Sequence, residues 1–275
     1  MLVIPWNINP EIFRIGGFAL RYYSIMFVLA FACSYYILSG IFVQENKKIH
    51  LLNRLTIYIF LGTLIGARLG HCFFYEWDYY RKVPWEIILP FRIQNGHFQV
   101  TGYQGLASHG GAVGILIATW LYSKKYKMNI LWLLDRLGIV IALSGFFIRT
   151  GNFFNSEIIG KSTNVPWAVV FERVDNVPRH PAMLYEAISY LIIFFILHHL
   201  YRINFYKIKN GLLFGIFLVL LFSVRFCVEF FKENQEAFER NLLLNLGQLL
   251  SIPFIIAGCW LIIRKDNTVN KYTMY

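Results

Sequence analysis

The sequence predicts an all-α integral membrane protein with seven transmembrane helices. Of its 275 residues, 57% are hydrophobic and only 15% are charged, whereas about a quarter of the residues in soluble domains are charged. Aromatic residues make up 18% of the chain, and they are favoured in bilayer cores and at bilayer edges. A helix needs roughly 20 apolar residues to cross the hydrocarbon core. The apolar runs cover residues 18–42, 55–74, 106–122, 131–148, 182–200, 212–231 and 243–263.

The loops between these runs predict the orientation. The loops after the first, third, fifth and seventh runs hold twelve basic residues but only two acidic ones, Glu45 and Asp266. The basic residues are Lys47, Lys48, Arg54, Lys124, Lys125, Lys127, Arg202, Lys207, Lys209, Arg264, Lys265 and Lys271. Because basic loops remain in the cytoplasm, we predict a cytoplasmic C-terminus and a periplasmic N-terminus. The odd number of spans agrees, because it places the termini on opposite sides.

We also predict a single polytopic membrane domain over residues 1–275. The longest segments between the apolar runs, about 75–104 and 151–180, fall on the outer side and are expected to contribute to the site. The net charge of +11 does not indicate nucleic-acid binding, because the basic residues lie in short loops rather than along one soluble face. The four cysteines lie inside apolar runs without paired spacing, so neither a metal site nor a disulfide framework is expected.

The segment that follows the fourth run carries the densest group of polar residues. It reads Arg149-Thr-Gly-Asn-Phe-Phe-Asn-Ser-Glu157-Ile-Ile-Gly-Lys-Ser-Thr163 and begins at the outer end of the predicted helix. A charged side chain at membrane depth is costly, and it therefore marks a working site. The glycines and short hydroxyl side chains suit a backbone that wraps closely around an anionic head group. We expect the chemistry to occur here.

Other polar residues interrupt the apolar runs. They are Tyr23, Arg68, His109, Glu186, Arg225 and Glu229. On the predicted topology nearly all of them lie in the outer half of the membrane, which favours one shared cavity. The arginines of this region, with Arg179 included, outnumber the nearby carboxylates, and a planar guanidinium suits phosphate. These residues therefore predict a site for the head group of a phospholipid.

Some of these patterns also have a structural interpretation. Arg225 and Glu229 are four residues apart and could simply neutralise one another. Asp135 and Arg136, near the cytoplasmic end of the fourth predicted helix, are expected to form a surface pair. Glycines recur every four positions at Gly62, Gly66 and Gly70, and again at Gly110 and Gly114. That spacing indicates two helices that pack closely in lipid.

The order of these motifs resembles the bacterial prolipoprotein diacylglyceryl transferase family over almost the whole chain. The most specific element runs from Arg149 to Gly160 and matches the family signature Arg-x-Gly-Asn-Phe-x-Asn-x-Glu-x-x-Gly. The other matching segments, in family order, are Tyr22-Tyr23, Gly66-Ala-Arg68-Leu-Gly70, His109-Gly-Gly111, Arg179-His-Pro181 to Tyr185-Glu186, Arg225 to Glu229-Phe-Phe231, and Gly247-Gln248. Among the departures, Ile148 stands where glycine is common in the family.

The resemblance implies an enzyme that transfers the diacylglyceryl group from phosphatidylglycerol to a cysteine thiol. That cysteine is the lipobox residue of a preprolipoprotein that still carries its signal peptide. The reaction would form a thioether, release glycerol phosphate and be the first step of lipoprotein maturation. The resemblance further implies a protein of the bacterial inner membrane with its active site facing the outer leaflet. Neither a metal nor a soluble cofactor is implied, and we expect a monomer.

The resemblance and the required chemistry together suggest catalytic roles. A thiol must become a thiolate before it attacks carbon. His109 is the first candidate for the general base, because the unperturbed pKa of histidine lies near neutrality. Glu157 and Tyr23 remain alternatives, and the thiol could also lose its proton by way of Arg225. Arg225, positioned by Glu229, is expected to stabilise the departing phosphate.

A second set of residues is expected to bind phosphatidylglycerol. Arg149, helped by Asn152, is expected to hold the head group, and Tyr23 to donate a hydrogen bond to it. Glu157 is expected to orient a partner or the glycerol hydroxyls. The other residues assigned to lipid binding are Asn155, Gly160, Arg68 and Arg179.

Three other classes of protein fit the sequence less well. A transporter for an anionic solute usually has two related halves with broken helices, and the sequence shows no internal repeat. A lipid-linked or isoprenoid transferase holds a divalent metal with acidic clusters, and the sequence has no Asp-rich motif. A purely structural scaffold would not tolerate so many charges at membrane depth.

Overall fold

The structure of this chain is a computed structural model that describes residues 4–15, 18–89, 91–94, 97–100, 105–204, 208–233 and 244–265. Lys207, Asp266 and Lys271, on which the predicted orientation partly rests, lie outside these residues. The chain divides into two compact units. The first unit contains Met1–Ile41 and Leu134–Tyr275, and the second contains Phe42–Leu133. The single membrane domain over residues 1–275 stays a prediction.

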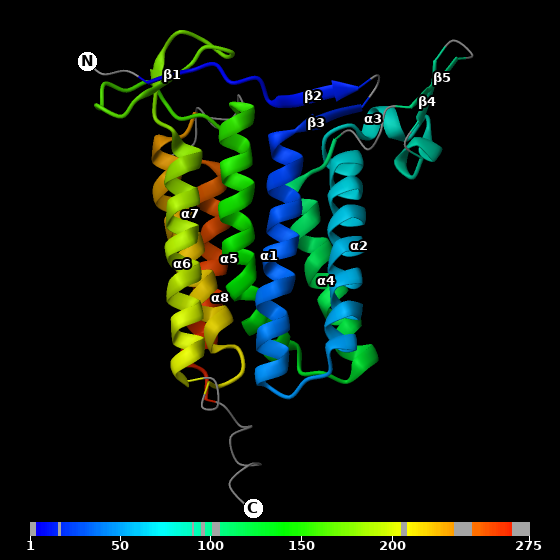
Figure 1. Cartoon of the computed structure of the whole chain (residues 1–275), viewed down its shortest axis with the longest axis vertical. Helices are drawn as coiled ribbons and strands as arrows, with labels where there is room; N and C mark the ends of the chain where they lie inside the picture. The colour runs from blue at the N-terminus through cyan, green and yellow to red at the C-terminus, as the bar shows by residue number, and fades with distance from the viewer. Residues whose placement is uncertain are drawn as a thin grey trace, which may run out of the picture. The chain divides into compact units, whose positions relative to one another are not determined.

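Long helices dominate both units (Figure 1). The first unit contains most of α1 (Tyr22–Gln44) and α5 (Ile130–Asn155), together with α6 (Ala182–Asn204), α7 (Leu212–Val228), the 3-10 turn η2 (Glu229–Phe231) and α8 (Leu246–Ile263). The second unit contains α2 (Ile49–Phe74), α3 (Trp77–Tyr80), the 3-10 turn η1 (Pro84–Ile87) and α4 (Ser108–Tyr126).

Six of the described helices are long and apolar enough to cross a membrane. They are α1, α2, α5, α6, α7 extended by η2, and α8. The predicted third run forms α4, a helix of 19 residues that is not among these six. The prediction of an all-α polytopic membrane protein is therefore confirmed. The count of seven spans and the orientation of the termini stay predictions.

The fourth predicted helix is longer than the apolar run that predicted it. The run ends at residue 148, but α5 continues to Asn155. The first half of the signature is therefore helical rather than a loop at the mouth of a span. The polar side chains of this last part of the helix find partners in the surrounding protein, so the helix does not need to end where its apolar residues end.

Short strands, which the sequence did not predict, form three small sheets. β2 (Glu11–Ile15) pairs antiparallel with β3 (Phe18–Arg21), so residues 18–21 precede α1 instead of belonging to it. β4 (Phe91–Gln94) pairs antiparallel with β5 (His97–Val100). The third sheet joins β1 (Ile4–Trp6), β6 (Val169–Phe171) and β7 (Pro178–Arg179), with β1 parallel to β6. These strands lie in segments that separate the long helices (Figure 1).

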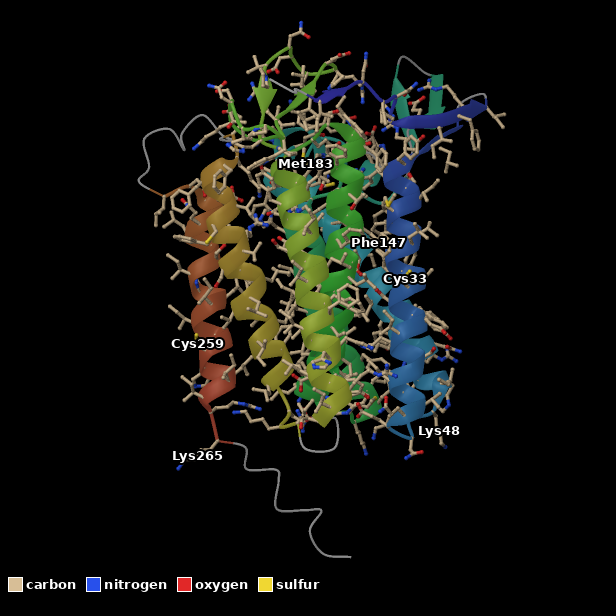
Figure 2. All side chains as sticks on the ribbon, turned by 60° about the vertical axis from the view of Figure 1, so that its left-hand side comes forward. Cys33, Lys48, Phe147, Met183, Cys259 and Lys265 are labelled. Carbon is tan, nitrogen blue, oxygen red and sulfur yellow. The ribbon has the colours of Figure 1, made fainter. Side chains whose placement is uncertain are left out.

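The sheet of β1, β6 and β7 covers the end of the first unit where α5 ends and α6 begins (Figure 1). Its core packs Phe171 against Met183, which Figure 2 labels at this end of α6. The ring centroids of Trp6 and Phe153 are 4.1 Å apart. The indole of Trp6 also donates a hydrogen bond of 3.2 Å to the carbonyl oxygen of Phe153. Strand β1 thus holds the signature segment at Phe153 and at Phe154, whose ring centroid is 5.8 Å from that of Trp6.

In the second unit, α2 and α4 pack backbone against backbone through their glycines. A Cβ atom added at Gly62 would lie 2.7 Å from the carbonyl oxygen of Gly114, and one at Gly70 would lie 2.7 Å from the Cα atom of Gly110. A Cβ at Gly66 would collide with the carbonyl oxygen of Gly110. The predicted close packing of these helices is confirmed.

Asp135 and Arg136 form the predicted ion pair, at 3.6 Å, but the pair is buried and does not lie at the surface. Asp135 is fully buried, and Arg136 is only 3% exposed. The carboxylate of Asp135 accepts hydrogen bonds from the backbone N–H groups of Gly211, at 2.7 Å, and Phe214, at 2.8 Å. It therefore caps the N-terminus of α7, where N–H groups lack helical partners and a negative charge is favoured. The predicted surface location was wrong because Asp135 has further partners at the start of α7, which is distant in sequence.

The contact between α2 and α4 predicts that glycine-to-alanine substitutions at Gly66 and Gly40 have different effects on stability. Gly66→Ala places a Cβ atom against the backbone of α4, and overpacking of this kind costs about 1–3 kcal/mol. Gly40→Ala, on α1, meets no atom within 4 Å and should leave the stability unchanged or slightly raised, because alanine favours helix. Thermal unfolding of both purified variants in detergent checks this. Equal unfolding temperatures would show that α2 and α4 do not pack as described.

Candidate active site

Five charged side chains of the first unit form a continuous chain of ion pairs, here called the ion-pair chain: Arg149, Glu186, Lys232, Glu229 and Arg225. Arg149 Nε lies 2.7 Å from Glu186 Oε2. Lys232 Nζ lies 2.9 Å from Glu186 Oε1 and 2.9 Å from Glu229 Oε1. Arg225 Nη2 is 4.0 Å from Glu229 Oε1, the longest of these separations.

The middle of the ion-pair chain is more deeply buried than its ends. The side chain of Glu186 is 0% exposed and that of Lys232 is 3% exposed. The side chains of Arg149 and Arg225 are 16% and 24% exposed. Buried charges are tolerated when they are paired and hydrogen-bonded, and Glu186 also accepts a hydrogen bond of 3.4 Å from the hydroxyl of Tyr190. The two arginines are therefore the members best placed to meet a ligand.

The N-terminus of α8 fixes Glu229. Asn245 caps this helix, because its side chain accepts a hydrogen bond from the backbone N–H of Gln248. The side-chain oxygen of Gln248 in turn accepts a hydrogen bond from the backbone N–H of Asn245. The amide nitrogen of Asn245 also donates a hydrogen bond of 3.2 Å to Glu229 Oε2. A Cβ atom at Gly247 would lie 2.5 Å from the carboxyl carbon of Glu229. The Gly247-Gln248 motif thus leaves room for Glu229 and holds its partner in place.

The signature segment folds back on the end of α5. Arg149 Nη1 donates a hydrogen bond of 3.2 Å to Asn152 Oδ1. The carboxylate of Glu157 accepts hydrogen bonds from the amides of Asn152, at 2.9 Å, and Asn155, at 3.1 Å. Ser156 has a φ of 57°, a left-handed conformation that turns the chain after the helix. Arg149, Asn152, Asn155 and Glu157 are thus brought together in one hydrogen-bonded group.

Tyr23 lies against this group from the start of α1. A Cβ atom at Gly151 would lie 2.8 Å from the ring of Tyr23 and 3.4 Å from its Cα atom. Only glycine lets the two helices approach so closely at this point. The phenol interacts electrostatically with both Glu157 and Arg149. The structure therefore places Tyr23 beside the signature residues, and its predicted role stays a prediction.

Gly160 joins three segments of the first unit. Its N–H donates a hydrogen bond of 2.9 Å to the carbonyl oxygen of His180, and it forms a β-bridge with Lys232. A Cβ atom here would lie 2.5 Å from that carbonyl oxygen and 2.7 Å from the carbonyl oxygen of Phe231. The glycine of the signature is therefore required by packing, and it holds the backbone of Lys232 in position.

Arg179 is engaged by other parts of the protein. It forms ion pairs of 2.6 Å with Asp175 and 2.8 Å with Glu233, and donates a hydrogen bond of 3.1 Å to the carbonyl oxygen of Gly160. Its guanidinium lowers the pKa of the Asp175 carboxyl. These contacts organise the segment around Gly160. The predicted binding of lipid by Arg179 stays a prediction.

Arg68 and His109 belong to the second unit. Arg68 lies over the ring of Tyr80, 4.9 Å from its centroid, and donates hydrogen bonds to the carbonyl oxygens of Glu86 and Ile87. These contacts attach the segment of α3 and η1 to α2. His109 lies in the first turn of α4 with an exposed side chain. The predicted roles of both residues stay predictions.

Of the pairings within the ion-pair chain, the sequence predicted only that of Arg225 with Glu229. Arg225 and Glu229 were considered as a mutually neutralising pair, but the short contacts of Glu229 are with Lys232 and Asn245. Lys232 was not among the predicted site residues. One available signal was its spacing, because it follows Glu229 by three residues. No signal along the sequence identifies Glu186 as the partner of Arg149.

Comparison with known proteins gives one family. The sequence model of the family described as prolipoprotein diacylglyceryl transferase matches residues 10–264. A protein of Bacteroides fragilis is 47% identical over 263 residues, which cover 94% of each chain. A protein of Tolumonas auensis is 46% identical over 254 residues, covering 92% of this chain and 94% of the relative. Both relatives are named phosphatidylglycerol–prolipoprotein diacylglyceryl transferase.

The burial of Glu186 predicts a large loss of stability when its charge is removed. Glu186→Gln leaves Arg149 and Lys232 without their shared carboxylate, and breaking a buried ion pair from one side costs about 3–5 kcal/mol. Glu172→Gln, an exposed position in the same unit, is the matched control. Thermal unfolding in detergent should separate the two variants clearly. A Glu186→Gln protein as stable as the Glu172→Gln protein would contradict the ion-pair chain.

Proposed function

Since the chain belongs to the prolipoprotein diacylglyceryl transferase family, we propose that it transfers the diacylglyceryl group of phosphatidylglycerol to the lipobox cysteine of preprolipoproteins. The products are a thioether-linked lipid on the protein and glycerol phosphate, in the first step of lipoprotein maturation. The observation that carries the proposal for the site is the ion-pair chain, whose two arginines are its most exposed cations. Arginine is well suited to bind phosphate.

The reaction requires removal of the thiol proton and stabilisation of the negative charge on the leaving group. The cysteine thiol loses its proton, and the thiolate sulfur attacks the diacylglyceryl carbon bonded to the phosphate oxygen. The carbon–sulfur bond forms as the carbon–oxygen bond breaks, and the electron pair leaves with glycerol phosphate. Negative charge therefore develops on the departing phosphate, and fixed cations near it lower the barrier.

The two arginines divide this work. Arg149, hydrogen-bonded to Asn152 and paired with Glu186, is held rigidly at the end of α5 and binds the head group. Arg225, 4.0 Å from Glu229, is only weakly neutralised by this carboxylate and stabilises the departing phosphate. Rigid placement of such groups matters because their reorganisation during the reaction would raise the barrier.

His109 is proposed as the general base. Histidine accepts a proton readily near neutral pH, and the exposed side chain of His109 lies at the start of α4. Glu157 and Tyr23 remain the alternatives. Glu157 is held by the amides of Asn152 and Asn155, which favours a role in orienting a partner or the glycerol hydroxyls.

We further propose that α4 is the seventh span and that the active site faces the outer leaflet. The arrangement of the first unit supports this orientation. β1, which contacts the signature segment, lies at one end of the unit, and Lys265, after α8, lies at the opposite end (Figures 1 and 2). The basic residues in the loops then place the C-terminus in the cytoplasm. The protein acts as a monomer on a lipid and a signal peptide that both reach it within the bilayer.

Depletion of the protein in its host tests the proposed function. Lipidated lipoproteins should disappear and return when the wild-type chain is expressed. Accumulation of unmodified preprolipoproteins is the readout. Undiminished lipidation after depletion would reject the function.

Arg149→Gln should lower transfer from labelled phosphatidylglycerol to a lipobox peptide by about 100-fold or more, because the cation that holds the head group in place for the reaction is lost. Arg14→Gln, at an exposed position of β2 in the same unit, is the control and should retain wild-type activity. Membrane insertion and detergent solubility of the two variants should match. Strong residual activity of Arg149→Gln would reject its head-group role.

His109→Gln should lower the rate constant of transfer by about 100-fold, the usual contribution of a positioned base. His50→Gln, in α2 of the same unit, serves as the control. The same peptide assay at saturating lipid measures the difference. Near-normal turnover by the His109→Gln enzyme would exclude this residue as the base and leave Glu157 and Tyr23.

A further inference from the structure

Lys232 is the one buried cation of the ion-pair chain that the proposed mechanism does not use. Resting on the proposed function, we propose that Lys232 is a positioning residue. It occupies the oxygen of Glu229 that Arg225 would otherwise bind, and so keeps Arg225 available for the anionic phosphate of the lipid substrate. Lys232 itself touches neither the lipid nor the peptide in this proposal.

The distances around Glu229 show how its two oxygens are divided. Oε1 lies 2.9 Å from Lys232 Nζ, and Oε2 accepts a hydrogen bond of 3.2 Å from the amide of Asn245. Arg225 Nη2 is 4.0 Å from Oε1. Direct charge-assisted hydrogen bonds are shorter than about 3 Å. Glu229 is therefore directly bonded to Lys232 and Asn245, and its interaction with Arg225 is a weaker one at longer range.

The backbone explains why Lys232 is favoured over Arg225. The α-helix ends at Val228, and residues 229–231 form the 3-10 turn η2. In a 3-10 turn, side chains three residues apart lie directly above one another, which brings Lys232 over Glu229. The β-bridge between Lys232 and Gly160 then fixes the lysine backbone to the signature segment. The geometry thus selects the i, i+3 partner over the i, i+4 partner.

Lys232 also holds the other carboxylate of the ion-pair chain. Its ammonium group lies 2.9 Å from an oxygen of Glu186 and is 3% exposed, whereas Arg225 is 24% exposed. A compact ammonium can serve two carboxylates at once. Without the ammonium group of Lys232, the negative charge of Glu229 would attract Arg225 more strongly, because opposite charges attract strongly where little water screens them. The arginine would then be neutralised before the lipid phosphate arrives.

Steady-state kinetics of the purified protein test this role. Lys232→Met should lower kcat by about tenfold, equivalent to about 1.4 kcal/mol, because Arg225 acts on the charge that develops in the transition state. The KM for phosphatidylglycerol should change by less than about threefold. Lys232→Arg keeps a cation between the carboxylates and should leave kcat within about threefold of the wild-type value. A rise in KM with an unchanged kcat, or equal kinetics of Lys232→Met and Lys232→Arg, would overturn the proposal.

Arg136→Met is the matched control for a general loss of stability. Arg136 is also 3% exposed and is also paired with a buried carboxylate in the first unit, but it lies with the capped N-terminus of α7. This variant should unfold at a lower temperature with an unchanged kcat for the folded enzyme. A fall in kcat equal to that of Lys232→Met would show that lost stability alone explains the effect, and would overturn the proposal.

Asn245→Ser provides a test that leaves Glu186 paired, in case Lys232→Met does not fold. Serine still caps α8 but loses the amide that binds Glu229 Oε2. The freed oxygen should draw in Arg225 and lower kcat by about threefold. An unchanged kcat would overturn the proposal. Absence of transfer by the wild-type protein would instead reject the proposed function, so the two failures are distinguishable.

Discussion

The site depends on one constraint: an ionised carboxylate, Glu186, is fully buried between helices. A charge in such a place is stable only when cations compensate the lost hydration. Arg149 and Lys232 do so at 2.7 and 2.9 Å. Because one cation comes from the end of α5 and the other follows η2, satisfying Glu186 ties three helices of the first unit together. The charge therefore organises the fold and the site at once.

The same constraint separates the enclosed cation, Lys232, from the two arginines that the proposed mechanism uses. Lys232 is enclosed by two carboxylates, and its backbone is bridged to Gly160. Arg149 and Arg225 lie at the two ends of the ion-pair chain, where they are more exposed. A phospholipid phosphate carries the charge that such arginines favour. The signature, the α8 cap and the strands over the end of α5 then all serve to keep these two guanidinium groups in fixed places.

Sequence patterns predicted the helices and the residue types of the site, but not its pairings. Apolar runs predict spans because a helix needs about 20 apolar residues to cross the bilayer core. The four-residue spacing of the glycines predicted close packing, and the structure shows that a Cβ atom at Gly66 would have no space. Charges at membrane depth identified Arg149 and Glu186, since such charges are costly. Lys232 was missed and Asp135 was placed at the surface because one partner of each, Glu186 for Lys232 and Gly211 for Asp135, is distant in sequence. Whether a charge is buried depends on tertiary contacts, and the periodicity of the sequence does not reveal these contacts.

The central claim is that the arginines of the ion-pair chain recognise the phosphate of the lipid. Binding of phosphatidylglycerol and of diacylglycerol, which lacks the phosphate, can be compared by native mass spectrometry of the purified protein. The account predicts that the wild-type protein prefers phosphatidylglycerol and that a variant with both Arg149→Gln and Arg225→Gln binds the two lipids equally. A preference that persists in the double variant would contradict the account.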